Sequence, residues 1–140
     1  ATMALQMQKY IHFERIVAWS PQASVMPEFM PYEHRWSHFR NRISSYRFPE
    51  VAELPQGDCS LFIFHGDHPS DLQHALALPI SGVAKQFVFR TGGSALAEWA
   101  ENKRILSTLT DLALDGKAFR LKRLVEKHGG LPIDAFVQGA

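Results

Sequence analysis

An unbroken run of four bulky apolar residues, Leu-Phe-Ile-Phe, occupies positions 61–64. A short continuous run rich in aromatic and β-branched residues is typical of a strand buried on both faces. A second run at positions 83–90, with Phe-Val-Phe at its centre, predicts another strand. Residues 10–19 are a candidate for a first strand, but their apolar positions do not alternate cleanly, so a helix running from Met3 is an alternative.

The pattern changes to a helical period in the segment 32–48. Apolar residues at positions 32, 36, 39, 43 and 46 fall on a single stripe, which predicts a helix. This is also the most basic stretch of the chain, with no acidic residue between Glu33 and Glu50 and with arginines at 35, 40, 42 and 47. One interpretation is a helix whose stripe faces the core and whose arginines face solvent. The other is a cationic surface that binds nucleic acid or a phosphate-bearing ligand.

Helical patterns also follow the two strands that the apolar runs predict. Ser70 with Gln73 forms a capping box, which predicts that a helix begins at Ser70 and runs to Pro79. A long helix is expected from about Ser94 to the Asp-Gly pair at 115–116. Another follows and ends at His-Gly-Gly at 128–130, and residues 131–137 form a short last helix or a docked tail.

This alternation of strands and helices predicts an α/β fold. We expect a small open, mostly parallel sheet of about three strands flanked by helices, with right-handed crossovers and a helical C-terminal third. The 140 residues suit one globular domain over 1–140. Because three strands make a thin sheet, an additional edge strand or a homo-oligomeric partner is expected to complete it.

Composition and charge limit the partners and the cellular location expected for this fold. No window approaches the roughly 18–20 apolar residues of a membrane span, so no membrane partner is expected. The first residues lack the pattern of a secretion signal, and the single Cys59 suits a reducing compartment, so a cytoplasmic location is expected. The net charge of +1 neither favours nor excludes nucleic acid. Cys59 itself is expected to be a buried structural thiol rather than a nucleophile.

Ionisable residues follow the central apolar run directly, in the order His65, Gly66, Asp67 and His68. Histidine titrates near neutral pH and a neighbouring carboxylate can fix its tautomer, so His65, Asp67 and His68 are candidate acid–base residues. They are also possible metal ligands, with His74 as an additional ligand, but the pattern does not identify a metal or a cofactor. The plainer interpretation is structural, with His65 ending a strand, Asp67 in a turn and His68 preceding a proline.

The residues after the next strand are the better candidates for binding phosphate. Paired glycines before a helix expose backbone N–H groups, and a neighbouring arginine supplies charge. The residues concerned are Arg90, Thr91, Gly92, Gly93 and Ser94, with Arg42 or Arg47 assisting. The alternative is an ordinary helix cap. If the sheet is parallel, this turn, the cluster at 65–68 and Ser20 meet at one edge of the sheet.

Residues 54–69 resemble a stretch found in some bacterial glycosyltransferase-like proteins. The shared features are a Leu-Pro pair, a glycine turn, an apolar strand and Phe-His-Gly before a proline, preceded by a basic Ser-Tyr-Arg at 45–47. The resemblance covers a small part of the chain. It implies a divergent or truncated transferase, although the Asp-x-Asp motif of metal-dependent sugar-nucleotide enzymes is absent from the sequence.

Two functional hypotheses follow. In the first, the domain binds a small anionic ligand that contains phosphate, such as a nucleotide or sugar nucleotide, with His65 and Asp67 as an acid–base pair. In the second, it is a non-catalytic binding or adaptor module. Its basic aromatic segment 32–48 would then contact nucleic acid or a protein partner.

Overall fold

The computed structural model describes residues 2–46, 50–55, 57–79, 81–91, 93 and 95–139. Within them, one sheet has the strand order β1-β2-β3-β4. Its first three strands are parallel and the last is antiparallel to its neighbour: β1 (Arg15–Trp19), β2 (Ser60–Gly66), β3 (Ala84–Phe89) and β4 (Leu131–Pro132). The helices are α1 (Thr2–Met7), α2 (Ser37–Arg40), α3 (Pro69–Ala77), α4 (Leu96–Asn102), α5 (Leu106–Leu114), α6 (Ala118–Lys127) and α7 (Ile133–Gly139). The predicted α/β class with a small, mostly parallel sheet is confirmed.

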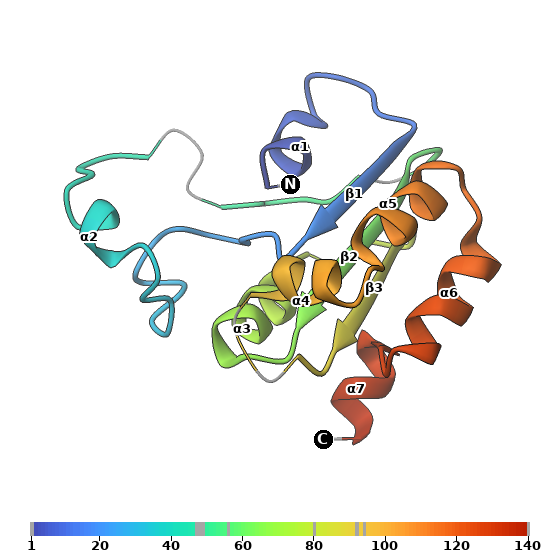
Figure 1. Cartoon of the computed structure of the whole chain (residues 1–140). Helices are drawn as coiled ribbons and strands as arrows, with labels where there is room; N and C mark the ends of the chain where they lie inside the picture. The colour runs from blue at the N-terminus through green and yellow to red at the C-terminus, as the bar shows by residue number, and fades with distance from the viewer. Residues whose placement is uncertain are drawn as a thin grey trace.

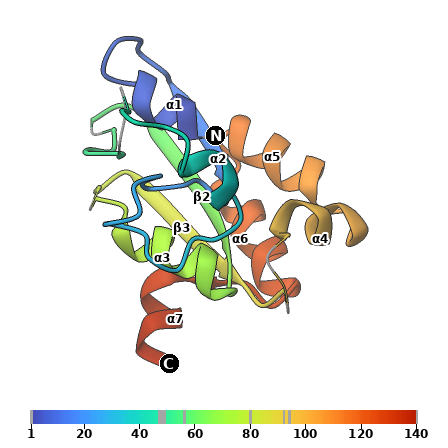
Figure 2. The same cartoon turned by 90° about the vertical axis from the view of Figure 1, so that its left-hand side faces the viewer.

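Helices cover both faces of the sheet, as Figures 1 and 2 show. Successive side chains of a strand point to opposite faces. Leu61 and Ile63 of β2 therefore pack in the core beside α1, whereas Phe62 and Phe64 pack in the core under α4, α5 and α6. This two-sided burial is the physical reason for the unbroken apolar run at 61–64.

The N-terminal residues contain both of the elements that the sequence left open. Helix α1 occupies positions 2–7 and strand β1 occupies 15–19, so neither a strand over all of 10–19 nor a continuous helix forms. In β1, Ile16 and Ala18 face the α1 side, and the ring of Trp19 packs at a tilt against that of Phe64 on the other side. The indole N–H of Trp19 donates a hydrogen bond to Thr110 Oγ1 at 3.1 Å and ties β1 to α5.

The prediction of a long helix over 32–48 is wrong. Only the four residues of α2 are helical between residues 32 and 46, and this helix lies at the far left of Figure 1. The predicted apolar stripe does not enter the core, because the side chains of Trp36 and Phe39 are 53% and 61% exposed. Glu33 explains the local failure, since its carboxylate accepts a hydrogen bond from the backbone N–H of Arg35 at 3.0 Å. Such side-chain bonds to the backbone compete with helix formation.

The predicted start of the helix after β2 is also corrected. Helix α3 begins at Pro69, and its N-cap is His68 rather than Ser70. His68 Nδ1 accepts a hydrogen bond from the backbone N–H of Ser70, so an imidazole replaces the expected hydroxyl in the cap. Proline suits the first helical position because its missing N–H has no acceptor there in any case.

The long helix predicted from Ser94 is instead two helices, α4 and α5. Arg104 between them adopts a left-handed backbone conformation with φ of +59°. The N–H groups of Arg104 and Ile105 donate to the carbonyls of Glu101 and Ala100, which is the Schellman arrangement that ends many helices. The turn buries Ile105, which explains why the helix ends there without a glycine.

In the C-terminal third, the helices end where the sequence predicts. Helices α5 and α6 end just before Gly116 and Gly129, as predicted from the sequence, and both glycines adopt positive φ. The predicted additional edge strand is present as β4, which pairs with Phe87 and Val88 of β3 before α7 begins. None of the described helices combines the length and apolar character needed to cross a membrane.

Candidate functional site

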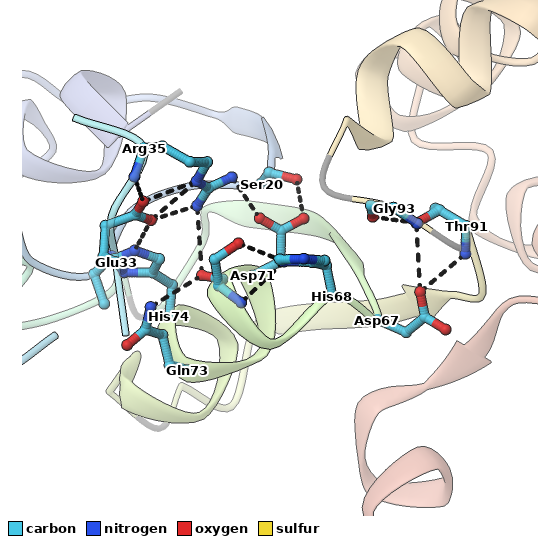
Figure 3. A network of polar contacts seen from close by, with 12 residues as sticks. Ser20, Glu33, Arg35, Asp67, His68, Asp71, Gln73, His74, Thr91 and Gly93 are labelled. Atoms are coloured by element: carbon cyan, nitrogen blue, oxygen red, sulfur yellow. Dashed lines mark hydrogen bonds and ion pairs between the residues drawn. The ribbon is translucent and has the colours of Figure 1, made fainter. Parts of the chain in front are cut away.

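The loops that follow the three parallel strands meet at one edge of the sheet. After β1, the backbone N–H of Ser20 donates to the carbonyl of Phe64 in β2 at 2.8 Å. After β3, the backbone N–H of Thr91 donates at 3.0 Å to Oδ1 of Asp67, which follows β2 (Figure 3). The convergence predicted from a parallel arrangement is therefore confirmed for these residues.

Gly66 makes this meeting possible. A Cβ added at this position would lie 2.8 Å from Oδ2 of Asp71 and 3.5 Å from Oγ1 of Thr91. The carboxylate of Asp71 thus approaches the backbone of β2 more closely than any side chain would permit. That same oxygen accepts a hydrogen bond from the hydroxyl of Ser20 at 3.1 Å.

A buried ionic network extends from Asp71 to the irregular segment after β1 (Figure 3). The guanidinium of Arg35 donates to Oδ1 of Asp71 at 2.9 Å and to both carboxylate oxygens of Glu33. His74 lies 3.0 Å from Glu33 through its Nε2 atom. Glu33, Asp71 and His74 are almost completely buried, at 1%, 2% and 1% exposure. The network therefore anchors the segment that contains Glu33 and Arg35 to helix α3.

The partners of His74 define its tautomer. Its Nδ1 atom accepts a hydrogen bond from the backbone N–H of Ala23 at 3.1 Å. The proton of the neutral ring must then lie on Nε2, where it is donated to Glu33. Burial lowers the pKa of His74, which favours this neutral form. Because both ring nitrogens are engaged, His74 has no free lone pair with which to act as a base.

The same contacts determine the ionisation of Glu33 and Arg35. Burial by itself raises the pKa of Glu33, but hydrogen bonds from Arg35 and His74 outweigh it and lower this pKa from 4.5 to about 2. The hydrogen bonds to Glu33 raise the pKa of Arg35. Both groups are therefore charged at neutral pH, with the Glu33 carboxylate buried and the Arg35 side chain 30% exposed.

His65, a predicted acid–base residue, is part of β2 and has no exposed surface. Its Nε2 atom lies 2.8 Å from the side-chain oxygen of Gln86, and its Nδ1 atom has no hydrogen-bond partner among the described residues. Burial lowers the pKa of His65 to about 4, so the ring is neutral at physiological pH. In this structure His65 is a core residue beside the edge rather than an exposed one.

The other predicted residues of the edge differ in accessibility. His68 is exposed and serves as the cap of α3, while Asp67 is half-buried and holds the loop after β3. In that loop Arg90 is exposed, and the hydroxyl of Thr91 donates to the carbonyl of Gly93 at 2.7 Å. Gly92 and Ser94 lie outside the described residues.

Of the two arginines predicted to assist, the structure describes only Arg42. Arg42 is exposed beyond α2, and no hydrogen bond or ion pair joins it to the strand-end residues that the structure describes. Arg47 lies outside the described residues. Whether the segment 32–46 contacts nucleic acid or a protein stays a prediction.

The thiol of Cys59 is buried, as expected, and burial raises its pKa.

Sequence reasoning missed most of the ionic network. Asp71 and His74 are three residues apart in α3, so a shared inward face was deducible once that helix was recognised. Glu33 and Arg35 carried no such signal, because their partners lie 36 to 41 residues away in the chain. Within the described residues, no group of three or more His, Cys, Asp or Glu side chains is arranged to hold a metal ion.

Comparisons with known proteins add no assignment to this geometry. No protein-family model matches the chain, and no curated protein or solved structure is significantly similar to it. The local resemblance of residues 54–69 to glycosyltransferase-like proteins stays a prediction.

Proposed function

We propose that this domain binds a small phosphate-containing ligand, such as a nucleotide or sugar nucleotide, at the carboxyl edge of its parallel sheet. The observation that supports the proposal is the hydrogen bond from Thr91 to Asp67, which joins the ends of β2 and β3 beside the exposed Arg90. Open α/β sheets bind their ligands in this position, where loops from neighbouring strands meet.

The contacts indicate which residue would bind each part of such a ligand. The N–H of Thr91 already donates to Asp67, so the phosphate would rely on the guanidinium of Arg90 rather than on this amide. The backbone N–H of Thr91 donates to Oδ1 of Asp67, and Oδ2 has no partner among the described residues. That oxygen is suited to accept a hydrogen bond from a sugar hydroxyl.

The proposal concerns binding, not turnover. A transferase would need an acid or base that reaches its substrate. His65 has no exposed surface and is held by Gln86, and both nitrogens of the buried His74 are engaged. At the edge Arg90 and His68 are exposed and Asp67 is half-buried, and His68 Nδ1 is engaged in the cap of α3. These groups suit recognition of an anionic, hydroxyl-rich ligand.

The test is calorimetric titration with a panel of nucleotides and sugar nucleotides. We expect one class to bind, and Arg90→Ala to weaken it by tenfold or more because the charged contact to phosphate is lost. Arg120→Ala is the matched control, since Arg120 is an exposed arginine on α6. A supporting measurement is thermal unfolding, because a ligand at about 100 times its Kd adds about 2.7 kcal/mol.

Two results would contradict the proposal. One is the absence of binding across the panel at millimolar ligand. The other is equal weakening by Arg90→Ala and Arg120→Ala, which would mean non-specific attraction by net charge. Asp67→Asn should weaken sugar nucleotides more than inorganic phosphate if Oδ2 contacts the sugar.

A further inference from the structure

A second candidate site lies away from the strand ends, in the irregular segment around α2. A cavity of about 260 Å³ is bounded there mainly by apolar and aromatic side chains and by one arginine. Its lining residues are Val25, Trp36, Phe39, Arg40, Ile43 and Tyr46, together with the polar Gln22 and Glu33. These include four of the five positions whose helical stripe was expected to enter the core.

Arg40 is the unusual member of this lining. Its Nε and Nη1 atoms are shielded from solvent and have no hydrogen-bond partner among the residues that the structure describes. A buried donor without an acceptor is unfavourable, and more so when it belongs to a charged group. Glu33, the acid in this lining, does not supply an acceptor for these N–H groups, because its carboxylate is occupied by Arg35 and His74.

The backbone holds Arg40 firmly in this position. It is the last residue of α2, and its carbonyl accepts hydrogen bonds from the N–H of Ile43 at 3.1 Å and from the hydroxyl of Tyr46 at 3.1 Å. Arg40 also borders a neighbouring hollow of about 420 Å³. The backbone of Arg40 is therefore fixed beside both hollows.

We infer that this cavity binds a small aromatic carboxylate, with the carboxylate on Arg40 and the ring between Trp36 and Phe39. A carboxylate supplies acceptors for the orphaned N–H groups of an arginine. An apolar cavity of about 150 Å³ already holds benzene, so 260 Å³ accommodates a single ring with a short acid side chain. The exposed faces of Trp36 and Phe39 offer the ring edge-to-face or offset contacts.

This site differs from the proposed phosphate site in both place and chemistry. Its anion is held by a shielded arginine among apolar walls, whereas Arg90 is exposed beside Asp67 and Thr91. The two proposals can therefore fail independently. Arg40 variants should leave nucleotide binding unchanged, and Arg90 variants should leave the cavity unchanged.

The test is fluorine NMR of protein labelled with 5-fluorotryptophan and titrated with phenylacetate. The chain has three tryptophans, and the signal of Trp36 is assigned by its absence in Trp36→Phe. We expect a saturable shift of the Trp36 signal, with Trp19 and Trp99 unmoved because they pack in the core on the other side of the sheet. Phenylacetamide, which lacks the charge, should bind at least tenfold more weakly.

Two variants separate the anion contact from general charge. Arg40→Met should weaken phenylacetate at least tenfold, whereas Arg42→Met removes an exposed arginine two residues away and should have little effect. Since Nε and Nη1 of Arg40 have no acceptor among the described residues, Arg40→Met should unfold at an equal or higher temperature than the native protein without ligand. A fall in this temperature would show that the guanidinium has a structural partner and would overturn the inference.

Other outcomes also overturn it. They are equal binding of phenylacetamide, equal effects of the two methionine variants, or no saturable shift with phenylacetate at 10 mM. A shift of Trp36 with a single-stranded oligonucleotide but not with phenylacetate would identify the segment as a nucleic-acid surface instead.

Discussion

Glu33 provides the strongest test of the buried ionic network. The substitution Glu33→Gln keeps the size of the side chain but replaces one carboxylate oxygen by an NH₂ group. Arg35 and His74 direct only donors at this position, so the new amide places a donor against a donor. Breaking a buried charged pair on one side is strongly destabilising.

The magnitude follows from the pKa of Glu33. Lowering it from 4.5 to about 2 corresponds to about 3 kcal/mol of stability at neutral pH. Because the folded protein binds the proton more weakly, this contribution is complete above pH 4.5 and is lost as the pH falls toward 2. At pH 3 about 2 kcal/mol of it should have disappeared.

Urea unfolding at pH 7 and pH 3 measures this change. The free energy of unfolding should differ between native protein and Glu33→Gln by about 2–3 kcal/mol at pH 7, and by about 2 kcal/mol less at pH 3. Asp71 and His74 are present in both proteins, so any part of their titration that does not depend on Glu33 cancels in the difference. Glu53→Gln, at an exposed position, is the control and should change stability by less than about 0.5 kcal/mol. The same difference at both pH values would refute the reasoning.

Two further predictions concern the backbone. Gly66→Ala should destabilise the protein by about 1–3 kcal/mol in a urea titration, because its Cβ would lie 2.8 Å from the Asp71 carboxylate. Gly82→Ala is the control, because a Cβ at that position meets nothing within 4 Å. A cost no larger than that of Gly82→Ala would contradict the close approach. Arg104→Gly should raise stability by up to about 1 kcal/mol, since a left-handed conformation costs about 1–2 kcal/mol without glycine. Lys103→Gly, at a right-handed position, should lower the thermal midpoint instead.

Much of the fold could be predicted because its signals are local. The apolar runs of β2 and β3 were recognisable, since burial on both faces demands an unbroken series of apolar side chains. Gly116 and Gly129 marked helix ends because glycine adopts positive φ without strain. From the parallel order of the strands, the meeting of Ser20, Asp67 and Thr91 followed as a consequence of topology.

The elements that were predicted wrongly depend on distant partners. The segment 32–46 has a helical pattern, yet Glu33 and Arg35 form their ion pairs with residues of α3, and its apolar stripe is left largely exposed. Arg104 ends α4 because the turn buries Ile105, a gain that offsets the unfavourable conformation of a residue with a side chain.

The candidate sites divide in the same way. The sequence alone determined which strand ends carry polar groups, because side-chain type and strand order are enough to place them. Only the tertiary structure decided that His65 is enclosed, that both nitrogens of His74 are engaged, and that Arg40 Nε and Nη1 are shielded without an acceptor among the described residues. Burial and hydrogen-bond partners are properties of the packed chain, and they determine which polar side chains remain available to a ligand.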